Sequence, residues 1–101
     1  MELMNYKKHY DILMAKASRV QTADADEWHR IEHEKRFAHE FDIHNDPNVV
    51  WLTLHQHVVA HKLMAKFRSE PHFAEAARYH HARKKLGKKH LNYEAWKAIH
   101  G

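Results

Sequence analysis

Apolar side chains recur at helical spacing in several stretches of this chain. The first stretch follows Asn5, a residue type that caps helix starts, and predicts a helix over residues 5–20. Its apolar positions, three or four residues apart, are Tyr6, Tyr10, Leu13, Ala17 and Val20. Glycine and proline, which favour turns, number only two each in 101 residues. The pattern therefore predicts a mainly α fold, α+β at most, in a single domain over residues 1–101.

The middle of the chain, up to Pro47, has an ambiguous pattern. Asp24, with Glu27 three residues later, is typical of a helix start in which the aspartate is the cap. A helical stripe could then extend over residues 28–41, although most of the intervening residues are polar. A short strand at residues 28–31 is the competing prediction, and the proline ends whichever element precedes it.

A strand and a long helix are predicted after this proline. Residues 49–52 read Val-Val-Trp-Leu and favour an extended strand. Thr53 is suited to cap a helix that continues to Phe67. The expected core stripe of this helix is Val59, Leu63 and Phe67, and a second face carries His57, His61 and Met64.

Two further helices are predicted in residues 69–101. Pro71 suits the first turn of one of them, and Leu86 with Gly87 suits its end. The residues expected to point inward from it are Phe73, Ala76, Ala77 and His80. Asn92 suits the cap of the last helix, which carries Tyr93, Trp96 and Ile99 on one face.

The composition excludes several kinds of site. The chain has no cysteine, so thiolate zinc sites, disulfides and cysteine nucleophiles are ruled out. Any metal site must use His, Asp or Glu, and His alone accounts for 13 residues. No apolar run approaches the roughly 20 residues that span a bilayer. The N-terminus also lacks the apolar stretch of a signal peptide, so a cytoplasmic protein without a membrane partner is expected.

The charge balance indicates an acidic partner. The formal net charge is +4, which favours nucleic acid or an acidic protein surface. Cations gather toward the C-terminus, where they would attract phosphates without reading bases, or simply solvate a helix end. The candidate partner-binding residues are Arg78, Arg83, Lys84, Lys85, Lys88 and Lys89. Trp28, Trp51 and Trp96 are predicted to be core or interface anchors rather than platforms for stacked bases.

One spacing predicts metal binding. His57 and His61 stand four residues apart on the predicted helix, so their imidazoles project from one face and can close on one ion. Asn48 precedes the first of them by nine residues. The alternative is a pair of His on a partly exposed helix face in a His-rich chain. A metal site would need a third ligand from elsewhere.

Three segments of the chain carry a resemblance to one protein family. They are Asn5-Tyr6-Lys7-Lys8-His9-Tyr10-Asp11-Ile12-Leu13, the central Asp46-Pro47-Asn48-Val49-Val50-Trp51-Leu52-Thr53 with His57-Val58-Val59-Ala60-His61-Lys62-Leu63, and Asn92-Tyr93-Glu94-Ala95-Trp96. In these segments the chain resembles the small HNH endonucleases that are common in bacteriophage genomes, including free-standing homing types.

The resemblance implies a ββα-metal core with flanking helices. In that family two strands and a helix surround one divalent ion, here Mg²⁺, Mn²⁺, Ni²⁺ or Zn²⁺. The first strand carries a metal ligand followed directly by a His that activates water as general base. The motif asparagine orients the site, and the helix supplies further His ligands. By this resemblance Asn48 would be the orienting residue, and His57 and His61 would bind the metal, within an HNH-like region over residues 24–67.

The first strand of the motif can be placed in three ways. Glu32 could be the ligand with His33 as base, which is the assignment we prefer for the metal and catalytic residues. His33 could instead be the ligand, with Glu34 as a substitute base. If His29 were the ligand, Arg30 would stand where the base belongs, and the site would be inactive. The His-His pair and the glycine pair of the family are absent, so the first half of the motif is degenerate.

Two functions follow from this resemblance. The degenerate motif favours a phage-type, HNH-derived protein without catalysis, which would bind a host protein or nucleic acid, DNA rather than RNA. Such a host protein could be a defence or DNA-processing enzyme, and no metal would be required. The alternative is an active, metal-dependent HNH endonuclease or nickase that cleaves DNA phosphodiester bonds. Either protein would work in the cytoplasm of the host cell.

Overall fold

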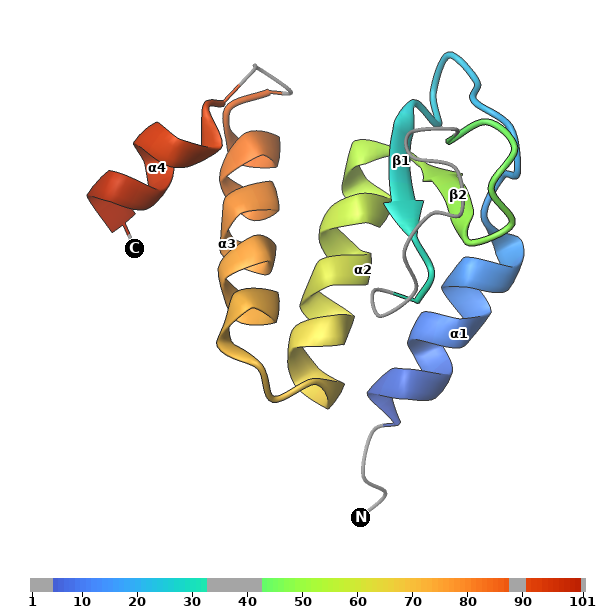
Figure 1. Cartoon of the computed structure of the whole chain (residues 1–101), viewed down its shortest axis with the longest axis horizontal. Helices are drawn as coiled ribbons and strands as arrows, with labels where there is room; N and C mark the ends of the chain where they lie inside the picture. The colour runs from blue at the N-terminus through green and yellow to red at the C-terminus, as the bar shows by residue number, and fades with distance from the viewer. Residues whose placement is uncertain (1–4, 33–42, 88–90, 101) are drawn as a thin grey trace.

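The chain is mainly helical and contains a small antiparallel sheet (Figure 1). The computed structural model describes residues 5–32, 43–87 and 91–100. Along the chain they form α1 (Tyr6–Lys16), β1 (Glu27–Arg30), β2 (Val49–Leu52), α2 (Leu54–Phe67), α3 (Pro71–Lys85) and α4 (Tyr93–His100). The prediction of a mainly α fold with at most a minor β component is confirmed. Among the described residues, none of the helices has both the length and the apolar character needed to cross a membrane.

The two strands form an antiparallel pair, and both contact α2. In their antiparallel register, Trp28 lies opposite Trp51 and His29 lies opposite Val50. Opposed residues share a face of the sheet, so His29 and Val50 point to one side and the two tryptophans to the other. On the far side of β2, the backbone N–H of Trp51 donates to the carbonyl of Ser18 at 2.7 Å. β1 is therefore the edge strand among the described residues.

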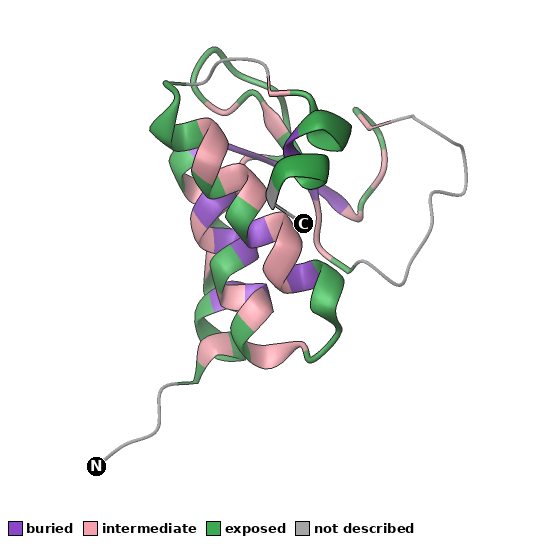
Figure 2. Ribbon diagram, turned by 90° about the vertical axis from the view of Figure 1, so that its left-hand side faces the viewer, coloured by how far each residue is buried: buried purple, intermediate pink, exposed green. Residues whose placement is uncertain are grey.

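The apolar core lies between α1, α2, α3 and one face of the sheet. Its buried cluster consists of Tyr10, Met14, Val50, Leu52, Ala60, Met64 and Phe73. α2 packs against both α1 and α3, so it occupies the centre of the molecule. α4 is largely exposed, as its green ribbon in Figure 2 shows. It buries Trp96, whose ring contacts Tyr79 of α3.

Capping residues define the helix starts as the sequence predicts. The Asn5 side chain accepts from the backbone N–H of Lys8, and the Thr53 hydroxyl accepts from that of Gln56. Gln56 returns a contact to the Thr53 backbone N–H, which completes a capping box. Pro71 begins α3, and Gly87 follows its end with a φ of 71°, a conformation that glycine adopts without steric cost.

Several predicted boundaries and faces were wrong. α1 ends at Lys16 rather than at residue 20, because the next residues become extended and Ser18 bridges to β2. The predicted helix start at Asp24 is absent, and Glu27 begins β1 instead. On α2 the stripe of Val59, Leu63 and Phe67 is only half-buried. The fully buried face is the one with His57, His61 and Met64, because the sheet, α1 and α3 meet there.

Candidate metal centre

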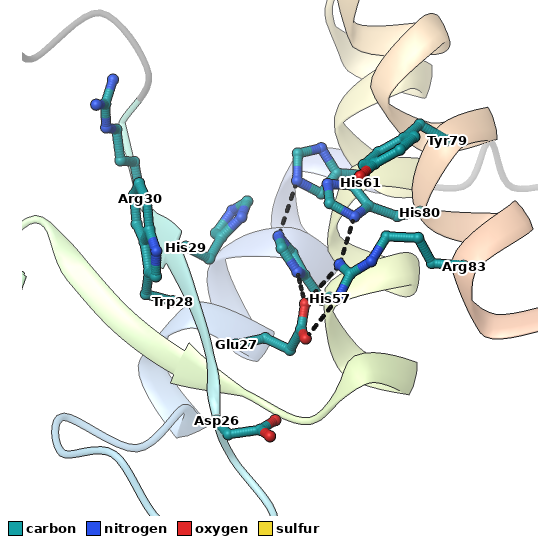
Figure 3. A pocket seen from close by; sticks show the side chains of 10 residues that line it. All are labelled: Asp26, Glu27, Trp28, His29, Arg30, His57, His61, Tyr79, His80 and Arg83. Carbon is teal, nitrogen blue, oxygen red and sulfur yellow. Dashed lines mark hydrogen bonds and ion pairs between the residues drawn. The ribbon is translucent and has the colours of Figure 1, made fainter. Parts of the chain in front are cut away.

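Three buried histidines converge between β1 and α2. They are His29, His57 and His61, and one ligand atom from each lies within 4.8 Å of the others. Their exposed fractions are 2%, 7% and 6%. His57 and His61 share a face of α2 because they are four residues apart, and His29 points at them from the inner face of β1 (Figure 3). This group could hold a metal ion.

Tyr10 of α1 orients His29. Its hydroxyl lies 2.8 Å from the carbonyl oxygen of Ile31, to which it donates its single proton. The hydroxyl oxygen of Tyr10 also lies 2.9 Å from Nε2 of His29. Because its proton is donated to Ile31, this oxygen accepts from Nε2 of His29. Nδ1 of His29 is then the nitrogen that would bind a metal. A ligand histidine whose other nitrogen is held in this way has a fixed tautomer and ring orientation.

Glu27 orients His57. Nδ1 of His57 donates to Oε1 of Glu27 at 2.9 Å, which leaves Nε2 of His57 with a lone pair. Arg83 of α3 donates to both oxygens of the same carboxylate, at 2.7 and 2.9 Å. The hydrogen bond from His57, together with Arg83, holds the pKa of Glu27 well below its usual range. The carboxylate therefore stays ionised, although it is largely buried.

The two helix ligands are already at metal-binding separation. Nε2 of His57 and Nε2 of His61 are 3.1 Å apart. Two nitrogens on a tetrahedral zinc ion with bonds near 2.05 Å would be separated by about 3.3 Å. Because Nδ1 of His57 donates to Glu27, its Nε2 accepts from His61, and a metal ion would take the place of that proton. Little movement of the α2 side chains is needed.

A fourth histidine covers the cluster from α3. The ring of His80 is centred 4.2 Å from His57 and 4.4 Å from His61. Its Nδ1 accepts from the Arg83 guanidinium at 3.1 Å. Burial lowers the pKa of His80 to about 3, and the neighbouring charge of the Arg83 guanidinium acts in the same direction, against the smaller opposing effect of Glu27. At neutral pH, His80 is therefore an uncharged imidazole beside the three candidate ligands.

A cavity opens beside the four histidines. Its volume is about 560 Å³, and residues from both faces of β1 line it. Figure 3 shows its lining, which consists of Asp26, Glu27, Trp28, His29, Arg30, His57, His61, Tyr79, His80 and Arg83. A site with three histidine nitrogens and room for a small ligand is suited to an anion that reaches a bound cation.

Asn48 joins the end of β1 to the start of β2. Its side-chain oxygen accepts from the backbone N–H of Glu32 at 2.8 Å, and its side-chain nitrogen donates to the carbonyl of Glu32 at 2.8 Å. The Asn48 carbonyl also accepts from the N–H of Ile31 at 2.8 Å. Asn48 therefore fixes the backbone just beyond His29, and it is not one of the three convergent histidines.

The predicted third ligand is corrected by the structure. Glu32 is exposed beyond the end of β1 and does not belong to the convergent group; His29 takes that place. His29 comes from the inner face of the strand, whereas Glu32 lies past the point where the strand pairing ends. His33, the predicted base, lies outside the described residues, as does Glu34. Of the three placements, the described geometry matches the one with His29 as ligand and Arg30 as the next residue.

Arg30 points away from the three histidines. Figure 3 shows its side chain beside Trp28, on the other side of β1, with the guanidinium carbon 5.8 Å from the centre of the indole ring. A guanidinium stays protonated in proteins and accepts no hydrogen bond. It therefore cannot act as the base that the family places directly after the strand ligand.

The four predicted basic residues that the structure describes differ in their surroundings. Arg78, Lys84 and Lys85 are exposed on α3, and Nζ of Lys84 lies 2.7 Å from Nδ1 of His55. Arg83 is instead half-buried and turned to Glu27, because that carboxylate lies on the neighbouring strand. Lys88 and Lys89 lie outside the described residues.

Sequence reasoning missed several residues of this centre. Glu27 was interpreted as part of a helix cap, Tyr10 and His80 as core positions, and Arg83 as a surface cation. The signal that could have located β1 is the alternation of Glu27 and His29, which places both on one face of a strand.

Comparisons with protein-family models, with curated proteins and with solved structures gave no match for this chain.

Proposed function

We propose that this chain is a phage-type, HNH-derived protein that binds nucleic acid at a metal centre without cleaving it. The observation that carries the proposal is the pairing of a complete set of ligand histidines with an arginine at the position of the base. His29, His57 and His61 converge, and Asn48 holds the adjoining backbone. The residue that follows His29 is Arg30.

The donor set favours zinc or nickel. All three ligand atoms are imidazole nitrogens, which suit Zn²⁺ and Ni²⁺, whereas Mg²⁺ prefers carboxylate and water oxygens. The nitrogens would be Nδ1 of His29 and Nε2 of His57 and His61. Three protein ligands leave a tetrahedral ion one further position, where its positive charge would attract a phosphate oxygen. Arg30, at the edge of the same cavity, adds a second positive group for the backbone.

Binding without cleavage follows from the arginine that stands at the position of the base. Loss of a positioned general base typically lowers a rate by about two to four orders of magnitude. The ligand histidines and Asn48 contribute to the shape and charge of the site, so binding of a phosphodiester does not depend on the base. The basic balance of the chain, +4 with His neutral, supports a polyanionic partner over a neutral one.

An active nuclease is the second candidate, and His80 is the observation that favours it. Its neutral imidazole lies beside His57 and His61 in the cavity and could accept a proton from water. Its pKa of about 3 makes it a weak base, because an effective base has a pKa near the working pH. We therefore rank cleavage below binding. A base role for His33 stays a prediction from the sequence.

A plasmid assay with one designed variant separates the two candidates. Supercoiled plasmid is incubated with the protein and Mg²⁺, Mn²⁺, Ni²⁺ or Zn²⁺. We expect retardation of the plasmid with zinc or nickel, its loss in EDTA, and no nicking. Arg30→His restores a titratable imidazole at the base position and is expected to introduce metal-dependent nicking. Arg30→Ala, which also removes the guanidinium but adds no base, is the matched control and should not nick.

The other possible results of the plasmid assay each support a different function. Nicking by the unaltered protein that disappears in His57→Ala would establish the nuclease and reject our proposal. Plasmid that is neither retarded nor nicked with any metal would reject both nucleic-acid functions. That result would leave a host protein as the expected partner.

A further inference from the structure

Trp28 is exposed beside the candidate metal centre. Its exposed fraction is 41%, whereas Trp51 is exposed by 2% and Trp96 by 8%. Of the three predicted core or interface anchors, Trp51 and Trp96 therefore lie in the core, whereas Trp28 is not a core residue. The strand pairing gives the reason, because Trp28 lies on the outer face of the edge strand, one residue before the inward-pointing His29.

The neighbours of Trp28 differ from those of its cross-strand partner. Trp51 is covered by His44, whose ring stacks on it at 5.2 Å with an interplanar angle of 17°. Trp28 has Arg30 beside it on the same face of β1, with the guanidinium carbon 5.8 Å from the indole centre. The indole and this cation also line the cavity that contains the three ligand histidines. An aromatic face, a fixed cation and a metal centre thus border one space.

We propose that Trp28 and Arg30 form a subsite for an unpaired nucleobase and its phosphate. The inference deepens the proposed function and rests on it: the nucleic acid held at the metal centre is single-stranded or locally unpaired. Aromatic side chains bind single strands by stacking on the faces of bases, and a neighbouring arginine contacts the backbone.

A regular duplex does not satisfy this subsite. Within a duplex, both faces of each base are covered by neighbouring base pairs, and exposing one requires the nucleotide to leave the stack. Unpaired bases are free to stack on protein aromatics without that cost. Trp28 therefore provides a preference for single strands, whereas the metal centre and Arg30 act on the phosphate backbone that both forms share.

The test measures binding of a fluorescein-labelled 12-nucleotide single strand and of the corresponding duplex by anisotropy. The protein is full-length and loaded with zinc. We expect the single strand to bind more tightly than the duplex. Trp28→Ala should weaken single-strand binding by about tenfold or more, the usual effect of removing a stacking aromatic, and should change duplex binding little. Trp28→Phe should retain part of the preference.

Ile12→Ala is the matched control. Ile12 is exposed by 42% on α1, almost the same fraction as Trp28, and does not line the cavity. The Ile12→Ala variant should bind the single strand and the duplex with unchanged affinity. Circular dichroism should show that every variant keeps its helices. Equal single-strand affinity in Trp28→Ala and the unaltered protein, with EDTA still abolishing binding, would overturn the subsite and leave the proposed function standing.

The remaining outcomes separate the two proposals. Single-strand binding that depends on Trp28 but is insensitive to EDTA would support the subsite and reject the metal-centred function. Failure of both labelled probes to bind in zinc would reject the subsite together with the function on which it rests, and would make Trp28 a contact for a protein partner.

Discussion

Glu27 is the residue on which the geometry of the centre depends most. It accepts from Nδ1 of His57 and receives both donors of Arg83. The first contact fixes the tautomer of a ligand histidine, and the second keeps the carboxylate ionised in a largely buried place. Tyr10 acts on His29 in the same manner, with a neutral hydroxyl. The centre is thus preorganised by residues that do not bind the metal.

Glu27→Gln should therefore weaken metal binding without removing a ligand. An amide can still accept from His57, but it loses the charge that makes the imidazole a better donor to the metal and that pairs with Arg83. We expect zinc affinity to fall by about 10- to 100-fold, the usual effect of losing such a partner. Competition with a chromophoric zinc chelator measures it. Glu70→Gln, which removes an exposed carboxylate paired with Arg68, is the control, and equal affinity in both variants would contradict this role.

At the scale of elements, the helices were predictable and β1 was not. Asn5, Thr53, Pro71 and Asn92 each supply a helix-start signal that needs no tertiary contact. β1 inverts the usual alternation, because its inward residues are charged or polar and Trp28 faces out. A pattern that looks for apolar residues inside therefore fails there. Such failures are expected where function, rather than packing, selects the residues.

α3 is held on the molecule partly by charge. It buries only Phe73 and Ala77 fully, and Arg83 joins its last turn to Glu27 of β1. Arg83→Ala leaves that carboxylate largely buried without its guanidinium. We expect the free energy of unfolding to fall by roughly 2–4 kcal/mol, near the lower end of the loss for a broken buried pair because both side chains retain some exposure.

Urea denaturation of Arg83→Ala beside Arg78→Ala tests the role of this pair. Arg78 is exposed on the same helix, so its removal should change the unfolding free energy by no more than about 0.5 kcal/mol. A similar small change in Arg83→Ala would show that apolar packing alone positions α3.

At the scale of the whole molecule, the core contains an ionisable centre. His29, His57, His61 and His80 lie together where α1, the sheet, α2 and α3 meet. The helix pair His57 and His61 was predictable from spacing alone. The contributions of His29 and His80 were not, because they depend on the strand register and on how α3 packs against α2. Assembly of the centre is therefore coupled to the tertiary fold.

This coupling predicts that the metal-free protein is destabilised by mild acid. The pKa of His80 is about 3 in the folded protein and near 6.5 in the unfolded chain, so the unfolded chain takes up the proton first. Stability should be complete above about pH 6.5 and should fall as the pH drops toward 3. Glu27 acts in the same direction at lower pH. Folding lowers its pKa, so below about 4.5 the unfolded chain takes up the proton first and the stability that the Glu27 ion pair contributes declines.

Replacing His80 with a residue that does not titrate isolates its part of this loss. His80→Phe keeps a ring over His57 and His61 but removes the proton site, so in EDTA its unfolding free energy should fall less with pH than that of the unaltered protein. Between pH 7 and pH 4, the unfolding free energy of the variant should rise relative to that of the unaltered protein by roughly 1–3 kcal/mol. Urea titrations at each half unit of pH measure the shift, with His81→Phe, an exposed neighbour on α3, as the control. A constant difference across this range would mean that His80 is protonated as readily in the folded protein as in the unfolded chain, and that α3 does not shield the centre from water.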